Sequence, residues 1–187
     1  MKIPDTDWIM IKPTGFSLGY LRPSDIAIID SDGKKVGGKH QPSSEVPFHV
    51  ALYKARPDIA AVVHTHSRYA TAFGIAGKDL LSIWNEGSIA RGVPVARYCT
   101  GGTNELAKVI VETMGDKYAV ILQNHGVVTV GASLESAYQT ALDVEWLAQM
   151  QFVATLVGEP KQLEHSEIEQ LVRDFGGNAA VQPDKAH

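Results

Sequence analysis

Val62-Val63-His64-Thr65-His66 is a short apolar run that ends in two histidines separated by one residue. Side chains alternate between the two faces of a strand, so His64 and His66 are expected to project together from one side. Two neutral imidazoles at a strand's end form half of a metal site, since imidazole is a common ligand for zinc and related ions. Histidines also lie near sheets for packing or hydrogen bonding, so this stretch alone leaves both interpretations open.

The composition is typical of a globular protein that does not bind nucleic acid. The chain has 187 residues and a formal net charge of -4, without the clustered Lys and Arg of a nucleic-acid surface. The single cysteine, Cys99, excludes an internal disulfide and fits a reducing compartment. No membrane span or signal peptide is recognisable. We therefore expect a cytoplasmic protein with one domain over residues 1–177 and a disordered tail over 178–187.

The first forty residues predict antiparallel strands. Apolar runs over 8–12 and 26–29 are typical of strands, and Asp32-Gly33 is typical of a hairpin turn before a third strand near Val36. Hairpins favour antiparallel pairing over a doubly wound parallel sheet. Thr14-Gly15, after the first strand, is either an ordinary turn or one that exposes backbone N–H groups.

A second informative stretch is Pro42-Ser43-Ser44-Glu45, which precedes apolar residues at helical spacing up to Pro57. In one interpretation, Ser44 caps the helix and Glu45 is favoured at its positive end. In the other, the helix N-terminus and the two serine hydroxyls bind a phosphate group, with Glu45 beside that anion. The stretch alone leaves both interpretations open.

The rest of the chain alternates helices with short strands. A strand is expected over 93–99, and helices are expected to begin at Ser67, Thr103 or Asn104, Ser133 and Ser166. A polar tetrad, Gln123-Asn124-His125-Gly126, separates two apolar strands. Gly126 would allow a tight bend that aims His125 across the sheet. This histidine is either functional or part of an ordinary turn.

Three histidines and one carboxylate then form a consistent set. His64 and His66 follow a strand, His125 lies between two strands, and Glu45 lies at a helix N-terminus. Three imidazoles with one exchangeable position are typical of catalytic zinc sites, because structural zinc sites are usually cysteine-rich and closed. An anion site next to the carboxylate would suit a small phosphorylated substrate.

Three motifs resemble those of one known family. They are Pro42-Ser43-Ser44-Glu45 with His49, Val63-His64-Thr65-His66-Ser67 and Gln123-Asn124-His125-Gly126, and they are similar in order and spacing to motifs of the class II aldolase/adducin family. Lys12-Pro13-Thr14-Gly15 is also similar to that family's phosphate loop. The resemblance extends from about residue 8 to residue 157. The family includes L-fuculose-1-phosphate aldolases and L-ribulose-5-phosphate 4-epimerases.

The resemblance implies a three-layer α/β/α fold around a largely antiparallel sheet, and a cyclic homotetramer with active sites between subunits. It implies a divalent metal, Zn2+ or else Mn2+ or Co2+, whose ligands would be His64, His66 and His125. Glu45 would be the catalytic acid/base and could also ligate the resting metal. The phosphate would be bound by Thr14, Gly15, Ser43 and Ser44.

The implied reaction is cleavage of a ketose phosphate of the L-fuculose-1-phosphate type to dihydroxyacetone phosphate and an aldehyde. The metal would act as a Lewis acid in that reaction. Epimerisation of L-ribulose 5-phosphate, or a related decarboxylation or dehydration of a sugar phosphate, would use the same metal chemistry. Two further hypotheses involve no catalysis. One is a non-catalytic adducin-like scaffold, a hypothesis that predicts loss of the metal ligands, and the other is an inactive truncated paralogue.

The chain departs from the family pattern at three places. Members normally have an N-terminal helix and a Gly-Asn loop before the first strand, and neither precedes Trp8. The family's aldolases place a tyrosine near a neighbouring subunit's site, whereas the stretch here is Trp84-Asn85-Glu86, with Glu86 as its only ionisable side chain. The position of the epimerase's aspartate falls near Ile89, and the last tyrosine is Tyr138, so the family's C-terminal catalytic tyrosine has no match.

Overall fold

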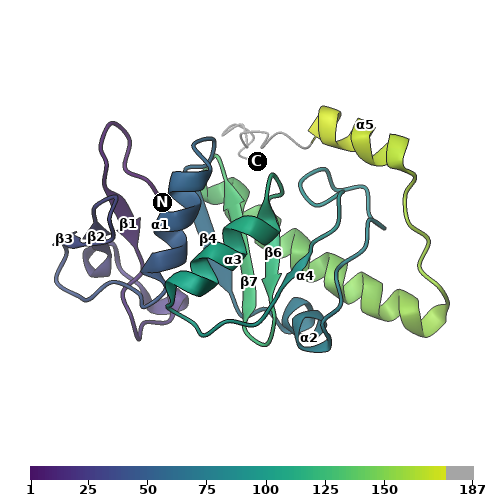
Figure 1. Ribbon diagram of the computed structural model, residues 1–187, viewed down its shortest axis with the longest axis horizontal. Helices are drawn as coiled ribbons and strands as arrows, with labels where there is room; N and C mark the ends of the chain where they lie inside the picture. Colours follow the sequence, from purple (N-terminus) through teal and green to yellow (C-terminus); the bar gives the residue numbers. More distant parts are fainter. Residues whose placement is uncertain (176–187) are drawn as a thin grey trace, which may run out of the picture.

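The protein is described here by a computed structural model over residues 1–175, which contains helices on both faces of a central sheet (Figure 1). The strands are β1 (Ile9–Ile11), β2 (Ala27–Ile29), β3 (Lys35–Gly37), β4 (Ala61–Thr65), β5 (Val95–Ala96), β6 (Ala119–Leu122) and β7 (Gly126–Gly131). The α-helices are α1 (Val46–Ala55), α2 (Arg68–Ala76), α3 (Asn104–Met114), α4 (Leu134–Val157) and α5 (His165–Phe175). Two short 3-10 helices, η1 (Leu18–Tyr20) and η2 (Pro23–Asp25), follow β1.

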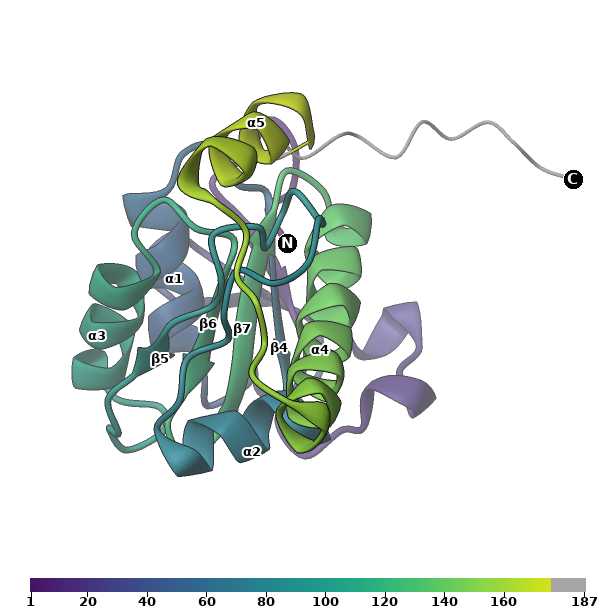
Figure 2. The same cartoon turned by 90° about the vertical axis from the view of Figure 1, so that its right-hand side faces the viewer.

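The predicted three-layer α/β/α arrangement is confirmed. Helices α1 and α3 cover one face of the sheet, and α2 and α4 cover the other (Figure 2). The four central strands are in the order β4-β7-β6-β5, and β7 is antiparallel to both of its neighbours. Strands β6 and β7 are buried along their whole length, so they form a fixed support for the groups at their ends.

The strands are not all in one sheet. The three N-terminal strands form a separate antiparallel sheet, in the order β1-β2-β3, as their hairpins predicted. Strand β5 is the exception to antiparallel pairing, because it is parallel to β6. It is also shorter than the predicted strand over 93–99. It begins after Pro94, which has no N–H to add to the ladder, and it ends at Ala96, opposite the last residue of β6.

Helix α1 begins differently from the sequence prediction. Its N-cap is Glu45, and Ser44 makes no capping hydrogen bond. A serine cap at 44 would need the N–H group of residue 46 or 47, and Pro47 has none. Ser43 Oγ instead accepts a hydrogen bond from the Glu45 N–H at 3.2 Å. The prediction of a Ser44 cap is therefore wrong.

Other helix starts agree better with the sequence. Thr103 and Ser133 cap α3 and α4 with their side chains. Ser67 is at the N-cap of α2, but its hydroxyl makes no capping bond. Helix α5 starts at His165, one residue before the predicted cap, and the predicted tail over 178–187 lies outside the described residues.

A carboxylate from α4 caps α2 in place of Ser67. Glu145 accepts the backbone N–H groups of Tyr69 and Ala70 at 3.0 and 2.9 Å. These two hydrogen bonds join α2 and α4 on one face of the sheet, at the point where the chain leaves β4.

In the part of the chain that the structure describes, no helix has the length and apolar character needed to cross a bilayer.

Candidate metal centre

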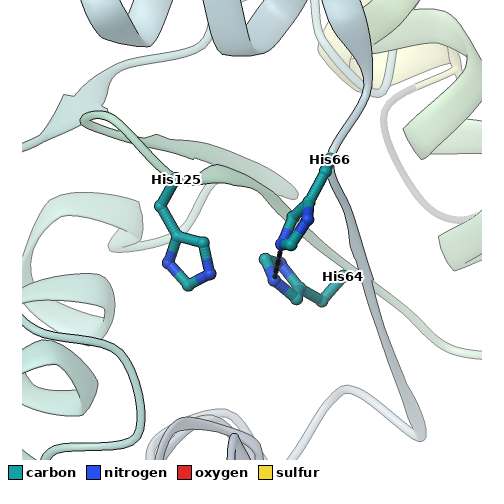
Figure 3. A group of neighbouring side chains, drawn as sticks. All are labelled: His64, His66 and His125. Atoms are coloured by element: carbon teal, nitrogen blue, oxygen red, sulfur yellow. Dashed lines mark hydrogen bonds between the residues drawn. The ribbon is translucent and has the colours of Figure 1, made fainter. Parts of the chain in front are cut away.

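Three histidine side chains meet at one end of the central sheet. One ring nitrogen each of His64, His66 and His125 could hold a metal ion, and these three atoms all lie within 4.8 Å of one another (Figure 3). His64 is in β4 and His66 follows that strand, so the predicted projection from one side is observed. His125 comes from the turn between β6 and β7, and β7 pairs directly with β4. Strand pairing therefore brings together residues that are far apart in the chain.

The orientation of His64 suits a metal ligand. Its Nδ1 lies 2.8 Å from the backbone oxygen of Val127, so an Nδ1–H donated there leaves Nε2 free to bind a metal. The Nε2 atoms of His64 and His66 are 3.1 Å apart. Zinc–nitrogen bonds of about 2.1 Å at tetrahedral angles place two nitrogens about 3.4 Å apart. The pair therefore fits around one divalent ion with little movement.

Gly126 allows the three rings to approach. A Cβ at this position would collide with the Thr65 carbonyl oxygen and would lie 2.8 Å from His66 Cδ2. Gly126 does not adopt a positive φ; the tight turn is made by Asn124, whose φ is 57°. The sequence prediction of a bend at Gly126 is corrected in this respect, because the glycine is required for close packing and not for its backbone conformation.

Burial keeps the imidazoles of His64 and His125 in the form that binds metals. It lowers the pKa of His64 to about 4. Burial also lowers the pKa of His125, although the negative charge of Glu45 acts in the opposite direction. Both rings are therefore neutral near pH 7, and a neutral ring offers a lone pair to a metal.

Glu45 lies beside the histidines with one oxygen that lacks a partner. Its Oε2 is buried and makes no hydrogen bond within the structure. A Cβ at Gly101 would lie 3.1 Å from Glu45 Oε1 and 3.7 Å from His125 Cε1, so both side chains face the same glycine. Glu45 is not part of the cluster of ligand nitrogens. A buried carboxylate oxygen without a donor needs a proton, a metal or a substrate group.

The predicted phosphate-binding segments lie next to each other. Pro13 and Pro42 form a β-bridge, and Thr14 N–H donates to the Gln41 carbonyl at 3.1 Å. Ser43 N–H donates to the Lys12 carbonyl at 2.9 Å. Gly15 has a φ of 75°, which favours glycine in this turn. The four predicted residues, Thr14, Gly15, Ser43 and Ser44, thus line two adjoining turns.

Sequence reasoning included Lys12 in the phosphate-loop motif without a role of its own, and it did not consider the Gly101-Gly102 pair. Lys12 Nζ donates to the carbonyls of Pro13 and Phe16, and its charge contributes to the lowered pKa of His64. Gly102 has a φ of 74°, and a Cβ there would lie 3.0 Å from the backbone carbonyl oxygen of Ser44. A double glycine directly after a predicted strand was the available signal.

Glu86 is at the other end of the sheet. The residues that follow it, Gly87 and Ser88, line a small cavity with Tyr118 and Ala119. These two residues are where β6 begins, whereas His125 follows the end of β6. Glu86 therefore does not join the metal centre of its own chain.

Known proteins share both the sequence pattern and this fold. A family model described as the class II aldolase and adducin N-terminal domain matches residues 1–152. The chain belongs to the class II aldolase and adducin family. The 5-deoxy-D-ribulose 1-phosphate aldolase of Bacillus thuringiensis is 36% identical over 170 residues, which are 90% of this chain and 80% of that protein.

Other members of the class II aldolase and adducin family are equally similar. The L-fuculose phosphate aldolase of Escherichia coli K12 is 37% identical over 172 residues, or 90% of this chain and 80% of that protein. A solved L-fuculose 1-phosphate aldolase matches with a TM-score of 0.87 and 33% identity, over 90% of this chain and 80% of its own. The predicted family, fold and enzyme class, an aldehyde-lyase, are confirmed.

Proposed function

We propose that this protein is a metal-dependent aldolase that cleaves a ketose 1-phosphate of the L-fuculose-1-phosphate type to dihydroxyacetone phosphate and an aldehyde. The observation that supports this most directly is the cluster of three imidazoles within 4.8 Å. A carboxylate oxygen without a hydrogen-bond partner lies beside it, on Glu45. The relatives' names include both fuculose-phosphate and 5-deoxyribulose-phosphate aldolases, so the aldehyde portion of the substrate is left to experiment.

His64, His66 and His125 are the proposed ligands of the metal. We propose zinc, although manganese and cobalt suit the same nitrogen ligands. A bound divalent ion would supply Lewis-acid polarisation of the ketose carbonyl. Glu45 is the proposed acid/base, with metal binding as a second role in the resting enzyme. When the carbon–carbon bond breaks, Glu45 would give a proton to the carbon that keeps the electron pair.

The phosphate group is assigned to the two adjoining turns. Thr14, Ser43 and Ser44 offer hydroxyl groups, and Gly15 allows its turn to expose backbone N–H groups. The N-terminal end of α1 adds a favourable dipole for an anion. Lys12 supplies positive charge at the first of these turns, where its Nζ donates to the carbonyls of Pro13 and Phe16. This arrangement holds one end of the substrate and presents the other to the histidines.

Glu86 is proposed to act in the site of a neighbouring copy. It occupies the stretch where related aldolases place a tyrosine, and it is remote from the histidines of its own chain. In the cleavage direction it would accept the proton of the hydroxyl group that becomes the aldehyde. This proposal requires assembly, and we propose a cytoplasmic homotetramer with sites between subunits.

The scaffold hypothesis lacks support from the site. A non-catalytic adducin-like protein has no need for three imidazoles around one point, and these are present together with Glu45. An epimerase, a decarboxylase or a dehydratase would use the same metal centre. These reactions differ in their products, so product analysis separates them from an aldolase.

Metal analysis and a product assay test the proposal together. The purified protein should contain a divalent metal, and His64→Ala should remove it, whereas His165→Ala on exposed α5 should retain it. Aldehyde release would then be followed with L-fuculose 1-phosphate, 5-deoxyribulose 1-phosphate and L-ribulose 5-phosphate. A protein that holds metal yet releases no aldehyde from these substrates contradicts the aldolase proposal. Retention of metal by the His64 variant contradicts the proposed ligands.

A further inference from the structure

Helix α4 contains a buried carboxylate that faces the loop of Glu86. Asp143 is only 6% exposed. Its Oδ1 accepts a hydrogen bond from Gln139 Nε2 at 2.8 Å, and its Oδ2 lies 3.5 Å from Ser88 Oγ. Asp143 thus connects the middle of α4 to the loop two residues after Glu86.

No cation compensates this carboxylate among the described residues. Glu145, on the same helix, is also an acid, and its carboxylate accepts hydrogen bonds from the N–H groups of Tyr69 and Ala70. Arg91, on the loop, binds Asp116 and Glu169, and the nearby charged groups of α5, Arg173 and Asp174, are exposed. A buried carboxylate without a cation is costly. An asparagine could keep both contacts without that cost, because its Oδ1 would accept from Gln139 and its Nδ2–H would donate to the Ser88 hydroxyl oxygen.

The negative charge of Asp143 acts on Glu86. Burial raises the pKa of Glu86, and the negative charge of Asp143 raises it further. Burial also raises the pKa of Asp143 itself. Two carboxyl groups that disfavour joint ionisation hold a proton to higher pH than either would alone.

The loop around Glu86 is fixed at several points. The ring of Trp84 stacks on that of Trp146 from α4, with centroids 6.4 Å apart. Gly87 lies directly against Phe175, since a Cβ there would be 2.6 Å from the Phe175 Cβ. The Glu86 carbonyl accepts the N–H of Ile89 at 3.1 Å. Glu86 is therefore held in place, as a group that acts on a substrate must be.

We propose that Asp143 is a positioning residue for Glu86, because it holds the loop of Glu86 through the Ser88 hydroxyl. The negative charge of Asp143 also makes Glu86 a stronger proton acceptor. The inference rests on the proposed function, in which Glu86 takes the hydroxyl proton as the carbon–carbon bond breaks. The electron pair of that bond stays on the carbon that Glu45 protonates, so both protons are accounted for. A stronger acceptor transfers the proton more readily near neutral pH.

The test compares Asp143→Asn with the unmodified enzyme over a range of pH. Glu86 must be ionised to accept a proton, so kcat/KM should rise with pH through the pKa of Glu86. Removing the charge of Asp143 lowers that pKa. The acid limb should therefore move to lower pH, by on the order of one pH unit, and kcat on its plateau should fall. Glu135→Gln, an exposed carboxylate of the same helix, is the matched control and should leave the limb in place.

An active Asp143→Asn enzyme with an unmoved acid limb would overturn the inference, because a purely structural Asp143 would alter stability alone. Side-chain carboxyl NMR of the unmodified protein provides a second measurement, which needs neither activity nor a folded variant. Glu86 should titrate above the ordinary range of a glutamate, in two steps coupled to Asp143. A single step at an ordinary value would also overturn the inference. Failure of aldehyde release alone contradicts the proposed function and leaves the NMR result to decide on Asp143.

Discussion

The backbone oxygen of Val127 lies 2.8 Å from Nδ1 of His64, across the pair of strands β4 and β7. The bond fixes the ring through a strand that is itself fully buried. Because Val127 follows Gly126 and His125, the same short segment orients one candidate ligand and supplies another. The geometry of the candidate metal centre therefore depends on the pairing of these two strands.

Replacing Gly126 by alanine should disrupt this centre. The new methyl group would meet the Thr65 carbonyl and the ring of His66, so one of the two must move. We expect metal affinity to fall by about 10-fold or more, as for other changes that misorient a ligand. Metal content after dialysis against a buffered chelator measures the effect. Gly158→Ala, where a Cβ meets open space, should bind metal like the unmodified protein.

Replacing Glu45 by glutamine should separate binding from catalysis. The amide keeps the size of the side chain but cannot exchange a proton with the substrate carbon. We expect much of the metal to be retained and kcat to fall by about 100-fold to 10,000-fold. Metal analysis and steady-state kinetics on the same preparation make the comparison. Near-normal turnover in Glu45→Gln would assign the proton transfer to another group.

The parts of the site that sequence reasoning predicted depend on local geometry. Alternation along a strand places His64 and His66 together, whatever the rest of the fold does. The position of His125 next to them required a third motif, because strand order cannot be read from one strand. The error at Ser44 also had a local cause, because Pro47 has no N–H for a cap at 44 and the Val46 N–H donates to the Ser43 carbonyl instead.

Long-range contacts account for what the sequence did not predict. Glu145 caps α2 from 75 and 76 positions away, a partnership that no spacing rule suggests. Asp143 and Ser88 are 55 positions apart, and Asp143 resembles any polar residue of an amphipathic helix in the sequence. The length of β5 likewise depends on where the neighbouring strand ends.

The stability of the metal-free protein should decrease as the pH falls below about 6.5. Burial lowers the pKa of His49 to about 3, so the unfolded chain binds a proton there that the folded chain does not. Such a group costs about 1.4 kcal/mol of folding free energy per pH unit between its two pKa values. Urea unfolding from pH 7 to pH 5 measures the slope. His49→Gln should make the slope shallower and leave the part that is due to His64 and His125, whereas substitution of the exposed His165 should not change it.

Helix α5 should detach when Gly87 is replaced by alanine. No residue of α5 is fully buried, so the helix depends on a few contacts with the rest of the chain. One of these is Phe175 against Gly87, and another is the 3.1 Å ion pair between Arg91 and Glu169. Hydrogen exchange of the α5 amides should become faster in the variant. Gly19→Ala has open space around it and should leave that exchange unchanged.

Assembly should depend on the outer side of α4. Tyr138 is 56% exposed and Trp146 63% exposed, and both belong to a run of apolar side chains along the helix. Exposed aromatic and aliphatic groups of this extent are typical of surfaces that other subunits cover. Tyr138→Glu should therefore lower the molecular mass measured by sedimentation, because a buried unpaired charge destabilises the contact. Tyr20→Glu, which changes a side chain that is 85% exposed on η1, should not. If the unmodified protein is a monomer, this contradicts both the proposed tetramer and the proposal that Glu86 acts in the site of a neighbouring copy.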